Sequence, residues 1–384
     1  MMQIAIIGGG IGGLVAGIAL QRAGFAPHIY ERAAQFGEVG AGISITPNAV
    51  KGLESLGLGG FLEANANEPL DQFLLHATTG EQLVRIDRRS CRETYGAAYY
   101  QMHRADLLEE LIRLFGRENC SLGHTLTGID SGASGVRLSF AGQADVTADG
   151  AIAADGLRSL VRDALFDPEP PQFSGHVAWR VLVPAAALPE HYVARSNVNH
   201  IGAGRNLVAY PVRGTQLVNI VALTRSDTWA EESWTAKADK AELAAHFAGW
   251  ADYVQTALAA IPADQVYRWG LFIRQPLTGW ISGRTALLGD AAHPMLPYMG
   301  QGASSAIEDG VVLGRCFAAQ AGFDDALSLY QRSRVARASL LQSETNLGGD
   351  RLQALDPYVL RDQPLRDEDA LGIFAYNPAG VPLG

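Results

Sequence analysis

Six residues near the amino terminus, five of them glycines, constrain the fold of this chain more than any other feature. The segment GGGIGG, residues 8–13, stands between an apolar run typical of a buried strand and a predicted helix from Leu14 to Ala23. Gly8 permits a tight turn, Gly10 leaves room for a pyrophosphate, and Gly13 lets helix and strand pack closely. The segment therefore predicts a strand–turn–helix unit that binds a dinucleotide.

An acidic residue follows the next predicted strand. That strand spans Pro27 to Tyr30 and ends at Glu31, about 20 residues past the glycines, where a carboxylate binds ribose hydroxyl groups in such units. The alternative is a glycine-rich loop without a ligand, which the two strands, the helix and Glu31 together disfavour. This unit alone does not distinguish FAD from NAD.

Two further segments place an aspartate just after a predicted strand. Asp155 follows Ala151–Ala154, and Asp290 follows Thr285–Leu288. Ligands of α/β proteins lie at the carboxyl ends of strands, so both aspartates are candidate cofactor ligands, although either can instead cap a helix. A helix that begins near Ala303 would direct its positive end at an anionic ring. Three motifs in this order predict bound FAD.

Length and pattern predict two interleaved domains. A chain of 384 residues exceeds what one core usually spans, and β-branched strands cluster within an otherwise α/β sequence. We predict an α/β fold with an α+β insert, in which a Rossmann-like FAD-binding domain is interleaved with a sheet-rich substrate domain. The FAD-binding domain would comprise residues 1–72, 101–172 and 276–350. The substrate domain would comprise residues 73–100 and 173–275, with a helical stretch at 240–261. Residues 351–384 would be a surface extension.

Composition excludes several classes of protein. The formal net charge is −10 and no basic stripe occurs, so we expect no nucleic-acid partner. No apolar run approaches the roughly 20 residues of a membrane span, and no secretory signal peptide precedes the first strand. Three scattered cysteines predict a reducing compartment, and no Cys/His spacing suits zinc. These features predict a cytoplasmic enzyme without membrane or metal, and they do not decide between a monomer and a homodimer.

The motifs and their surroundings resemble the class A single-component flavoprotein hydroxylases of aromatic substrates. The supporting segments are GGGIGGLVAGIAL, YER, GAGISITPNAV, MHRADL, ADGLRSLVR, YPVRGTQLVNIVAL and LGDAAHPMLPYMGQGASSAIEDG, in family order over nearly the whole chain. The chain is similar to the group of salicylate hydroxylase, 3-hydroxybenzoate 6-hydroxylase and 6-hydroxynicotinate 3-monooxygenase. The resemblance implies an enzyme that hydroxylates a small phenolic or hydroxylated (hetero)aromatic acid. It would use NAD(P)H and O2 and act through a flavin C4a-hydroperoxide.

The resemblance also implies roles for single residues at the cofactor. Gly8, Gly10 and Gly13 would contact the FAD pyrophosphate, and Glu31 the adenosine ribose. Asp290 would bind the ribityl chain, and Gly302 and Ala303 would lie near the flavin ring. Arg104 and Asp155 would also contact FAD. Asp155 would also serve NAD(P)H, which binds transiently because no second strand–GxGxxG–helix unit occurs.

The substrate pocket is less well defined. Tyr210 lies on a strand that faces the flavin in the family, and it is either a catalytic residue that bonds the substrate phenol or a core tyrosine with a satisfied hydroxyl. Tyr298, in the loop after Asp290, is either a catalytic substrate contact or a packing residue. His293 of the same loop is interpreted as structural rather than as a base.

Three arginines, Arg180, Arg205 and Arg213, are candidate partners for a substrate carboxylate, because arginine binds carboxylates bidentately. Arg205, beside a glycine-rich turn, is the favoured one, and a surface arginine is the alternative.

Three positions depart from the patterns of the relatives. Pro297, a candidate substrate contact, stands where 3-hydroxybenzoate 6-hydroxylases tend to carry glutamine, and Asn206 stands where they tend to carry histidine. Ser44 replaces the histidine of the hydroxynicotinate enzymes. Salicylate-type hydroxylation with decarboxylation and hydroxylation of another aromatic acid therefore both stay open. A flavin reductase or oxidase that installs no oxygen, and a non-catalytic flavin-binding sensor, are the competing hypotheses.

Overall fold

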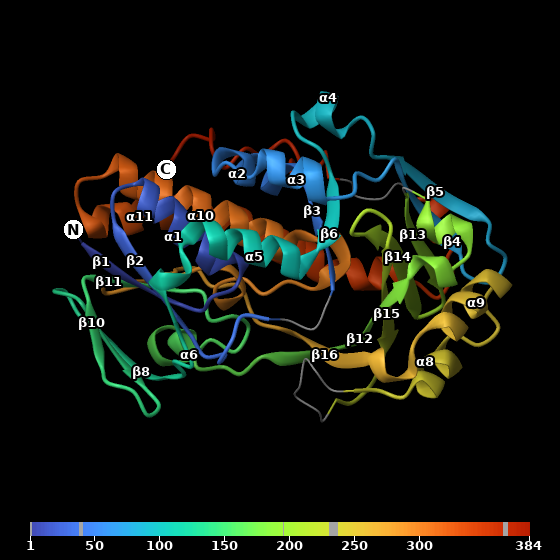
Figure 1. Ribbon diagram of the computed structural model, residues 1–384, viewed down its shortest axis with the longest axis horizontal. Coiled ribbons are helices and arrows are strands. Elements are labelled where there is room, and N and C mark those ends of the chain that lie inside the picture. The colour runs from blue at the N-terminus through green and yellow to red at the C-terminus, as the bar shows by residue number, and fades with distance from the viewer. Residues whose placement is uncertain (1, 38–40, 195, 230–236, 364–367) are drawn as a thin grey trace.

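The computed structural model describes residues 2–37, 41–194, 196–229, 237–363 and 368–384. A six-stranded sheet, seen at the left of Figure 1, has the strand order β17-β18-β11-β1-β2-β7. Its strands are β1 (Gln3–Ile7), β2 (Ala26–Glu31), β7 (Cys120–Leu122), β11 (Gly150–Ala153), β17 (Ile281–Ser282) and β18 (Thr285–Leu287). All neighbouring strands pair in parallel except β17 with β18. Buried apolar residues fill β1, as a parallel strand covered on both faces requires.

Helices cover this sheet. They include α1 (Ile11–Arg22), α5 (Arg104–Phe115), α10 (Gln301–Ala319) and the long α11 (Phe323–Leu352). Helix α1 is apolar around most of its circumference because the sheet and α10 enclose it. A side chain at Gly314 would meet Ala19 at 2.5 Å, so α1 and α10 approach as closely as a glycine allows.

A second, seven-stranded sheet has the order β16-β12-β15-β14-β13-β4-β5 and lies to the right in Figure 1. Its strands are β4 (Asp71–His76), β5 (Gln82–Asp87), β12 (Gln172–Pro184), β13 (Ser196–Gly202), β14 (Arg205–Val212), β15 (Leu217–Arg225) and β16 (Tyr267–Ile273). One face packs against α8 (Lys240–His246) and α9 (Asp252–Ala260). The prediction of one helical stretch over 240–261 was wrong, because Gly249 adopts a left-handed backbone (φ +76°) that separates α8 from α9.

Smaller elements complete the fold. Strands β3 (Gly42–Ile45) and β6 (Tyr100–His103) pair antiparallel, and β8 (Leu126–Ser131), β9 (Val136–Phe140) and β10 (Val146–Ala148) form a three-stranded sheet. The remaining helices are α2 (Pro47–Ser55), α3 (Gly59–Asn65), α4 (Cys91–Tyr95), α6 (Leu160–Leu165), α7 (Glu190–Val193) and α12 (Val359–Asp362).

The predicted fold class is confirmed, since a parallel Rossmann-like sheet and a separate, mostly antiparallel sheet alternate along the chain. Strands of the second sheet come from residues 71–87 and 172–273, between segments that supply the first. We keep the division into two domains as a proposal, with its first boundary moved to Asp71, where β4 begins.

The C-terminal segment lies at the surface, where most of its described residues are exposed or partly exposed, and a few buried residues anchor it to the protein. Ile373 and Phe374 are buried beside Leu341 of α11. The ammonium group of Lys51 donates to the carbonyl oxygen of Phe374 at 2.8 Å, and the guanidinium group of Arg337 donates to that of Ile373 at 3.2 Å. An apolar pair within a segment rich in proline and charge was the overlooked signal.

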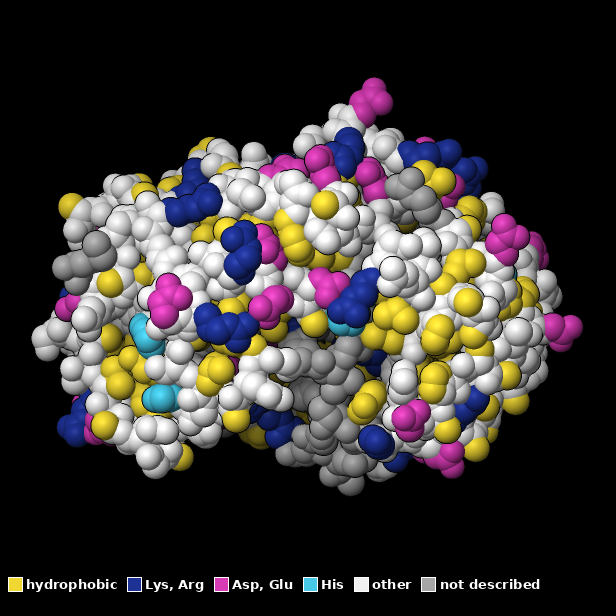
Figure 2. Space-filling view, viewed as in Figure 1, with side chains coloured by type: hydrophobic (Ala, Val, Ile, Leu, Met, Phe, Trp, Pro, Cys, Tyr) yellow, Lys and Arg dark blue, Asp and Glu magenta, His cyan; other side chains and the backbone are white. Residues whose placement is uncertain are grey.

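The surface carries charges of both signs. On the face shown in Figure 2, arginine and lysine side chains are interspersed with aspartate and glutamate. None of the described helices combines the length and the apolar character that crossing a membrane demands.

Candidate flavin and substrate site

Four predicted cofactor segments follow neighbouring parallel strands and therefore meet at one edge of the six-stranded sheet. Strands β18, β11, β1 and β2 lie in this order, so Asp290, Asp155, the glycine turn at 8–13 and Glu31 follow one another along that edge. With about 4.8 Å between neighbouring strands, the row spans about 14 Å. An extended dinucleotide fits such a row with one end at Glu31 and the other at Asp290.

The glycine turn has the geometry of a phosphate cradle. Gly8 has a φ of +104°, and a Cβ at Gly13 would lie 2.1 Å from the carbonyl oxygen of Gly8, so both positions require glycine. A Cβ at Gly10 would meet no atom within 4 Å, which leaves open space at the start of α1. Open space beside a helix N-terminus suits a pyrophosphate.

Glu31 braces this turn. One of its carboxylate oxygens accepts a hydrogen bond from the backbone N–H of Gly9 at 2.7 Å, and the other accepts from that of Ala33 at 2.9 Å. A carboxylate oxygen has a second lone pair, so ribose hydroxyl groups can still donate to Glu31.

Asp155 caps a helix and also presents a spare oxygen. Its Oδ2 accepts from the backbone N–H of Val161 in α6 at 3.3 Å, which is the alternative that the sequence left open. Its Oδ1 is buried and has no partner among the described residues. Burial raises the pKa of Asp155, and the nearby Ser159 hydroxyl opposes that rise. The orphaned oxygen fits a cofactor hydroxyl group.

Asp290 lies in the short 3-10 turn Gly289–Ala291 next to the N-terminus of α10. Asp290 is exposed to solvent in this structure. The surrounding protein groups nevertheless reduce the hydration of its carboxylate, which raises its pKa, and His293 and Arg104 oppose this rise. A Cβ at Gly302 would lie 3.9 Å from its Oδ1, so Gly302 and the adjacent Ala303 border the same space. An accessible carboxylate surrounded by protein has the environment of a ligand contact.

Arg104 joins these cofactor candidates from the N-terminus of α5. Burial and the neighbouring Arg180 lower the pKa of Arg104 to about 10, and Asp290 opposes that shift. Arg104 therefore lies between the flavin edge and the seven-stranded sheet.

His293 is held beneath this loop. Its Nε2 lies 2.6 Å from Oδ2 of Asp309, whose Oδ1 accepts from the guanidinium Nε of Arg334 at 2.7 Å. All three side chains are buried. Burial raises the pKa of Asp309, but His293 and Arg334 outweigh burial and bring it to about 2. This placement supports the structural interpretation of His293.

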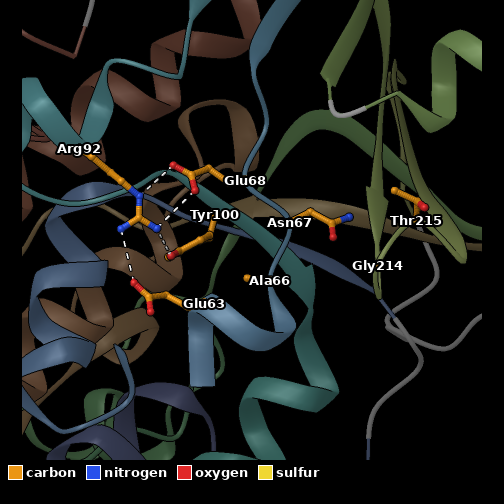
Figure 3. Close-up of a pocket in the computed structure, with 8 residues that line it drawn as sticks. All are labelled: Glu63, Ala66, Asn67, Glu68, Arg92, Tyr100, Gly214 and Thr215. Atoms are coloured by element: carbon orange, nitrogen blue, oxygen red, sulfur yellow. Dashed lines mark hydrogen bonds and ion pairs between the residues drawn. The ribbon is translucent and has the colours of Figure 1, made fainter. Parts of the chain in front are cut away.

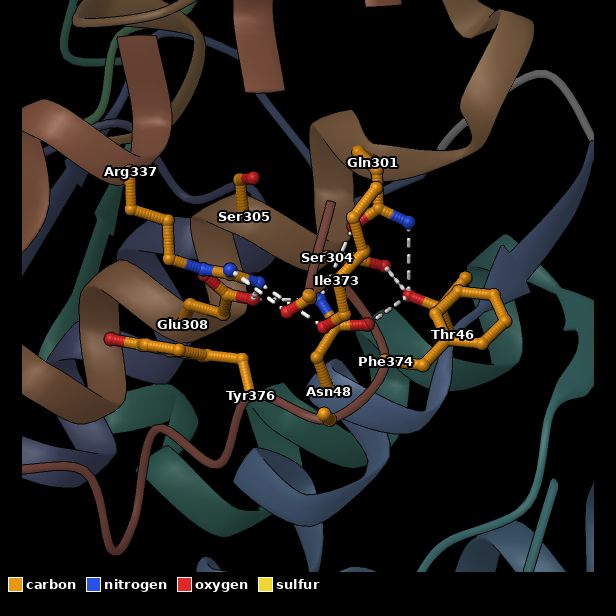
Figure 4. A network of polar contacts seen from close by, with 12 residues as sticks. Thr46, Asn48, Gln301, Ser304, Ser305, Glu308, Arg337, Ile373, Phe374 and Tyr376 are labelled. Carbon is orange, nitrogen blue, oxygen red and sulfur yellow. Dashed lines mark hydrogen bonds and ion pairs between the residues drawn. The ribbon is translucent and has the colours of Figure 1, made fainter. Parts of the chain in front are cut away.

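A second buried network fixes the start of α10 (Figure 4). Glu308 accepts from the side-chain amide of Asn48 at 2.7 Å and from Arg337 at 2.9 Å, and its carboxylate pairs with Arg334. Asn48 also contacts Gln301. The glutamate was missed in the sequence because its partners are far apart along the chain.

One face of the seven-stranded sheet is turned toward the flavin edge. Strand pairing places Arg180, Val221 and Val208 in one row across β12, β15 and β14. These three side chains are partly exposed although they lie in the middle of the sheet. The adjacent rows are buried and contain Ala178 and Leu223 on one side. Arg180 is therefore partly accessible on this face, between the flavin edge and the sheet.

Tyr210 lies in the next row on the same face, opposite Asn219. Its ring packs against Gly42 of β3, where a Cβ would meet it at 2.6 Å. Burial, together with Tyr99, raises the pKa of Tyr210 well above its usual range, and Arg180 and Ser44 oppose that rise. Tyr210 therefore keeps its proton at neutral pH.

Tyr298 is engaged by protein groups. Its hydroxyl lies 2.7 Å from Nδ1 of His176, and its ring rests on Gly348 and Gly349 of α11. This arrangement supports the packing interpretation, while its neighbour Pro297 is exposed. The loop reaches the sheet face through Leu296, which packs with Ala178 and Leu223.

The favoured carboxylate partner, Arg205, lies elsewhere. It alternates with Leu207 and Ala209, which pack in the core under α8 and α9, so Arg205 is on the opposite face of β14 from Tyr210. Arg213 pairs with Asp106 at 2.6 Å beside the β14–β15 turn. Of the three arginines, only Arg180 lies on the sheet face of Tyr210 beside Arg104, and an odd spacing between Arg205 and Tyr210 was the signal against Arg205.

Replacement of Asp290 by alanine is expected to weaken FAD binding about 10- to 100-fold, the effect of one lost charge-assisted hydrogen bond. The melting temperature of the apoprotein should change little, because Asp290 is exposed. Flavin fluorescence during dilution measures retention. The exposed Asp264→Ala serves as control, and unchanged retention in Asp290→Ala would contradict the assignment.

Comparisons with known proteins agree with this geometry. The family model described as FAD binding domain matches residues 1–345. The chain is 36% identical to a 3-amino-4-hydroxybenzoate 2-monooxygenase of Streptomyces platensis (100% of this chain, 97% of the relative) and 32% identical to the 6-hydroxynicotinate 3-monooxygenase of Pseudomonas fluorescens (99% and 96%). The crystal structure of Klebsiella pneumoniae HpxO complexed with FAD and uric acid superposes with a TM-score of 0.87 at 28% identity, covering 99% of this chain and 98% of that one.

The row of cofactor ligands, the family match and these relatives together identify the cofactor and the class of enzyme. The chain belongs to the FAD-binding family of flavoprotein monooxygenases that hydroxylate aromatic compounds.

Proposed function

We propose that the enzyme hydroxylates a small aromatic acid that carries a hydroxyl group, with NAD(P)H as reductant and O2 as oxidant. One observation carries the proposal: the partly exposed Arg180 lies in the middle of a buried sheet face, beside Tyr210 and opposite the flavin edge. A cation, a phenol-type hydroxyl and an apolar wall together fit an aromatic ring with a carboxylate and a hydroxyl substituent. The relatives named for aminohydroxybenzoate and hydroxynicotinate support the same class of substrate.

Bound FAD would supply the redox chemistry with NAD(P)H and O2. The side chains of this chain bind and orient the substrate. Burial lowers the pKa of Arg180 to about 10, so the guanidinium group remains charged and can bind a carboxylate. Its guanidinium group stacks over the Trp269 ring, 4.5 Å from the ring centroid, which fixes its direction. Leu223 and Leu296 exclude water from the ring of the substrate.

Tyr210 supplies the polar contact to the hydroxyl group of the substrate. Because it keeps its own proton, Tyr210 can donate or accept a hydrogen bond but does not serve alone as a general base. Pro297 remains a proposed contact at the loop side, whereas we propose that Tyr298 packs and orients this loop through His176.

The proposal is tested with the FAD-loaded protein and a panel of hydroxylated benzoic and pyridine carboxylic acids. NADH and NADPH oxidation, hydrogen peroxide and product mass are measured. A product heavier by one oxygen, labelled from 18O2, supports the proposal, and release of CO2 identifies salicylate-type chemistry. NAD(P)H oxidation that yields only hydrogen peroxide with every acid would favour the oxidase alternative, which the hydroxylase relatives argue against.

Replacement of Arg180 by methionine is expected to raise KM for the acid substrate about 10- to 100-fold, the effect of one lost bond to a charged group. The methyl ester of the same substrate should be affected less than threefold. Arg205→Met is the matched control, because Arg205 lies on the other face of the sheet. An equal loss with acid and ester, or a loss of FAD, would contradict the role.

Localisation and assembly are further parts of the proposal. We infer a cytoplasmic enzyme, a monomer or homodimer, supported by three cysteines that are all free.

A further inference from the structure

A row of polar side chains connects Tyr210 with an open groove. Ser44 of β3 lies directly opposite Gln101 of β6, and Gln101 lies directly opposite Asn67 through two backbone hydrogen bonds of 2.8 Å. Directly opposite residues point to the same face of a sheet, with Cβ atoms about 5 Å apart. Ser44, Gln101 and Asn67 therefore form a continuous line, referred to below as the amide row.

The two ends of the amide row have different surroundings. At the inner end, Gly42, which faces the same side of β3 as Ser44, packs against the Tyr210 ring, and Ser44 lies near enough to Tyr99 and Tyr210 to oppose the rise that burial causes in the pKa of both hydroxyl groups. At the outer end, Asn67 lines a groove of about 470 Å³, where it extends toward Thr215 of the β14–β15 turn (Figure 3). The row thus leads from the proposed phenol site to solvent.

The middle of the amide row has unmet hydrogen-bonding capacity. Gln101 is fully buried, and neither its amide nitrogen nor its amide oxygen has a partner among the described residues. The amide nitrogens of Asn67 and of Asn219, the neighbour of Tyr210 on β15, are orphaned in the same way. An orphaned buried polar group destabilises the fold, so such groups are normally satisfied by ordered water. Water held by three amides would make the row continuous.

We propose that the amide row is the exit path for the proton of the substrate hydroxyl group, with Gln101 as the residue that positions its water. This inference rests on the proposed function. The substrate hydroxyl gives its proton to the oxygen of Tyr210 as Tyr210 gives its own to the Ser44 oxygen and Ser44 gives its hydroxyl proton to the water beside Gln101. Water along Gln101 and Asn67 then passes one proton to the groove. The products are a bound phenolate and one proton in the groove.

The groove suits the delivery of a proton. Its rim carries the carboxylates of Glu63 and Glu68, which share one cation, Arg92, so the rim has an excess of negative charge. The electron pair of the broken O–H bond stays on the aromatic ring, which becomes a better nucleophile for hydroxylation. A route of this kind explains how a site with a protonated Tyr210 can ionise a phenol.

The test uses the FAD-loaded enzyme and 4-hydroxy-3-nitrobenzoate, a phenolic acid whose ionised form absorbs visible light. The bound probe is mixed with buffer of higher pH, and the appearance of phenolate is followed by stopped flow. Gln101→Met, which keeps the volume and removes the polar atoms, should slow this step at least tenfold without changing probe affinity or FAD content. Asn67→Leu should have the same effect at the outer end.

The matched control is Gln342→Met, another buried glutamine, which donates to the carbonyl oxygen of Arg274 outside the row. It should leave the rate unchanged. Unchanged rates in both row variants, or a slowing that follows loss of probe affinity, would overturn the inference. The readout needs binding and ionisation but no turnover, so failure of the proposed hydroxylation would be seen separately in the substrate panel. In turnover, the defect of Gln101→Met should vanish above the pKa of the free phenol.

Discussion

Gly13→Ala is expected to yield little folded protein and no retained FAD. The added methyl carbon would lie 2.1 Å from the backbone oxygen of Gly8, where α1 packs against the turn that follows β1. Overpacking against backbone costs at least about 1–3 kcal/mol, and here no side chain can move aside. The yield of soluble protein, its melting temperature and its flavin content measure the effect.

Gly10→Ala is the matched comparison for this prediction. The same methyl group at Gly10 meets no atom within 4 Å, so the apoprotein should melt at the temperature of the wild type. It would nevertheless occupy the space assigned to the pyrophosphate, and FAD binding should fall strongly. Wild-type FAD affinity in Gly10→Ala would mean that the cofactor lies elsewhere.

Arg334→Met is expected to lower the free energy of unfolding by about 3–5 kcal/mol, the usual cost of leaving buried charges without their partner. Arg334 is fully buried and pairs with both Glu308 and Asp309, each at 2.7 Å. Denaturant unfolding of the apoprotein at neutral pH measures the loss. Arg337→Met removes a more exposed partner of Glu308 and should cost clearly less. Equal losses would show that burial of the cation is not what decides the effect.

The same pair predicts a dependence on pH. The pKa of Asp309 is about 2 in the folded protein, below the ordinary value near 3.9. The stability that this carboxylate contributes is therefore complete above about pH 4 and is lost as pH falls toward 2. Without Arg334 the pKa of Asp309 rises, so the difference between wild type and Arg334→Met should shrink in acid.

The cofactor candidates could be predicted because their signals are local. A strand, a turn and a helix within a short segment specify Gly8, Gly10 and Gly13, and an aspartate after a strand marks Asp290. The parallel sheet then brings these segments to one edge whatever the length of the intervening chain.

The substrate site could not be predicted to the same extent, because strand register decides it. Arg180 lies on the same sheet face as Tyr210 because it pairs with Val221, whereas Arg205 is five residues from Tyr210, which puts it on the other face. Gln101 has no sequence signal, since its importance follows from its neighbours Ser44 and Asn67 on other strands.

The order of strands in the flavin sheet has a consequence for biosynthesis. Neighbours β1, β11 and β18 come from the beginning, the middle and the last third of the chain. A ribosome must therefore release most of the polypeptide before Asp290 can join Gly8, and FAD cannot template the early segments during translation. Until then the edge of β11 that β18 will cover is open to wrong pairing. Loading of the flavin is thus a late event, and shortage of riboflavin should show itself as aggregated full-length chains rather than as truncated ones.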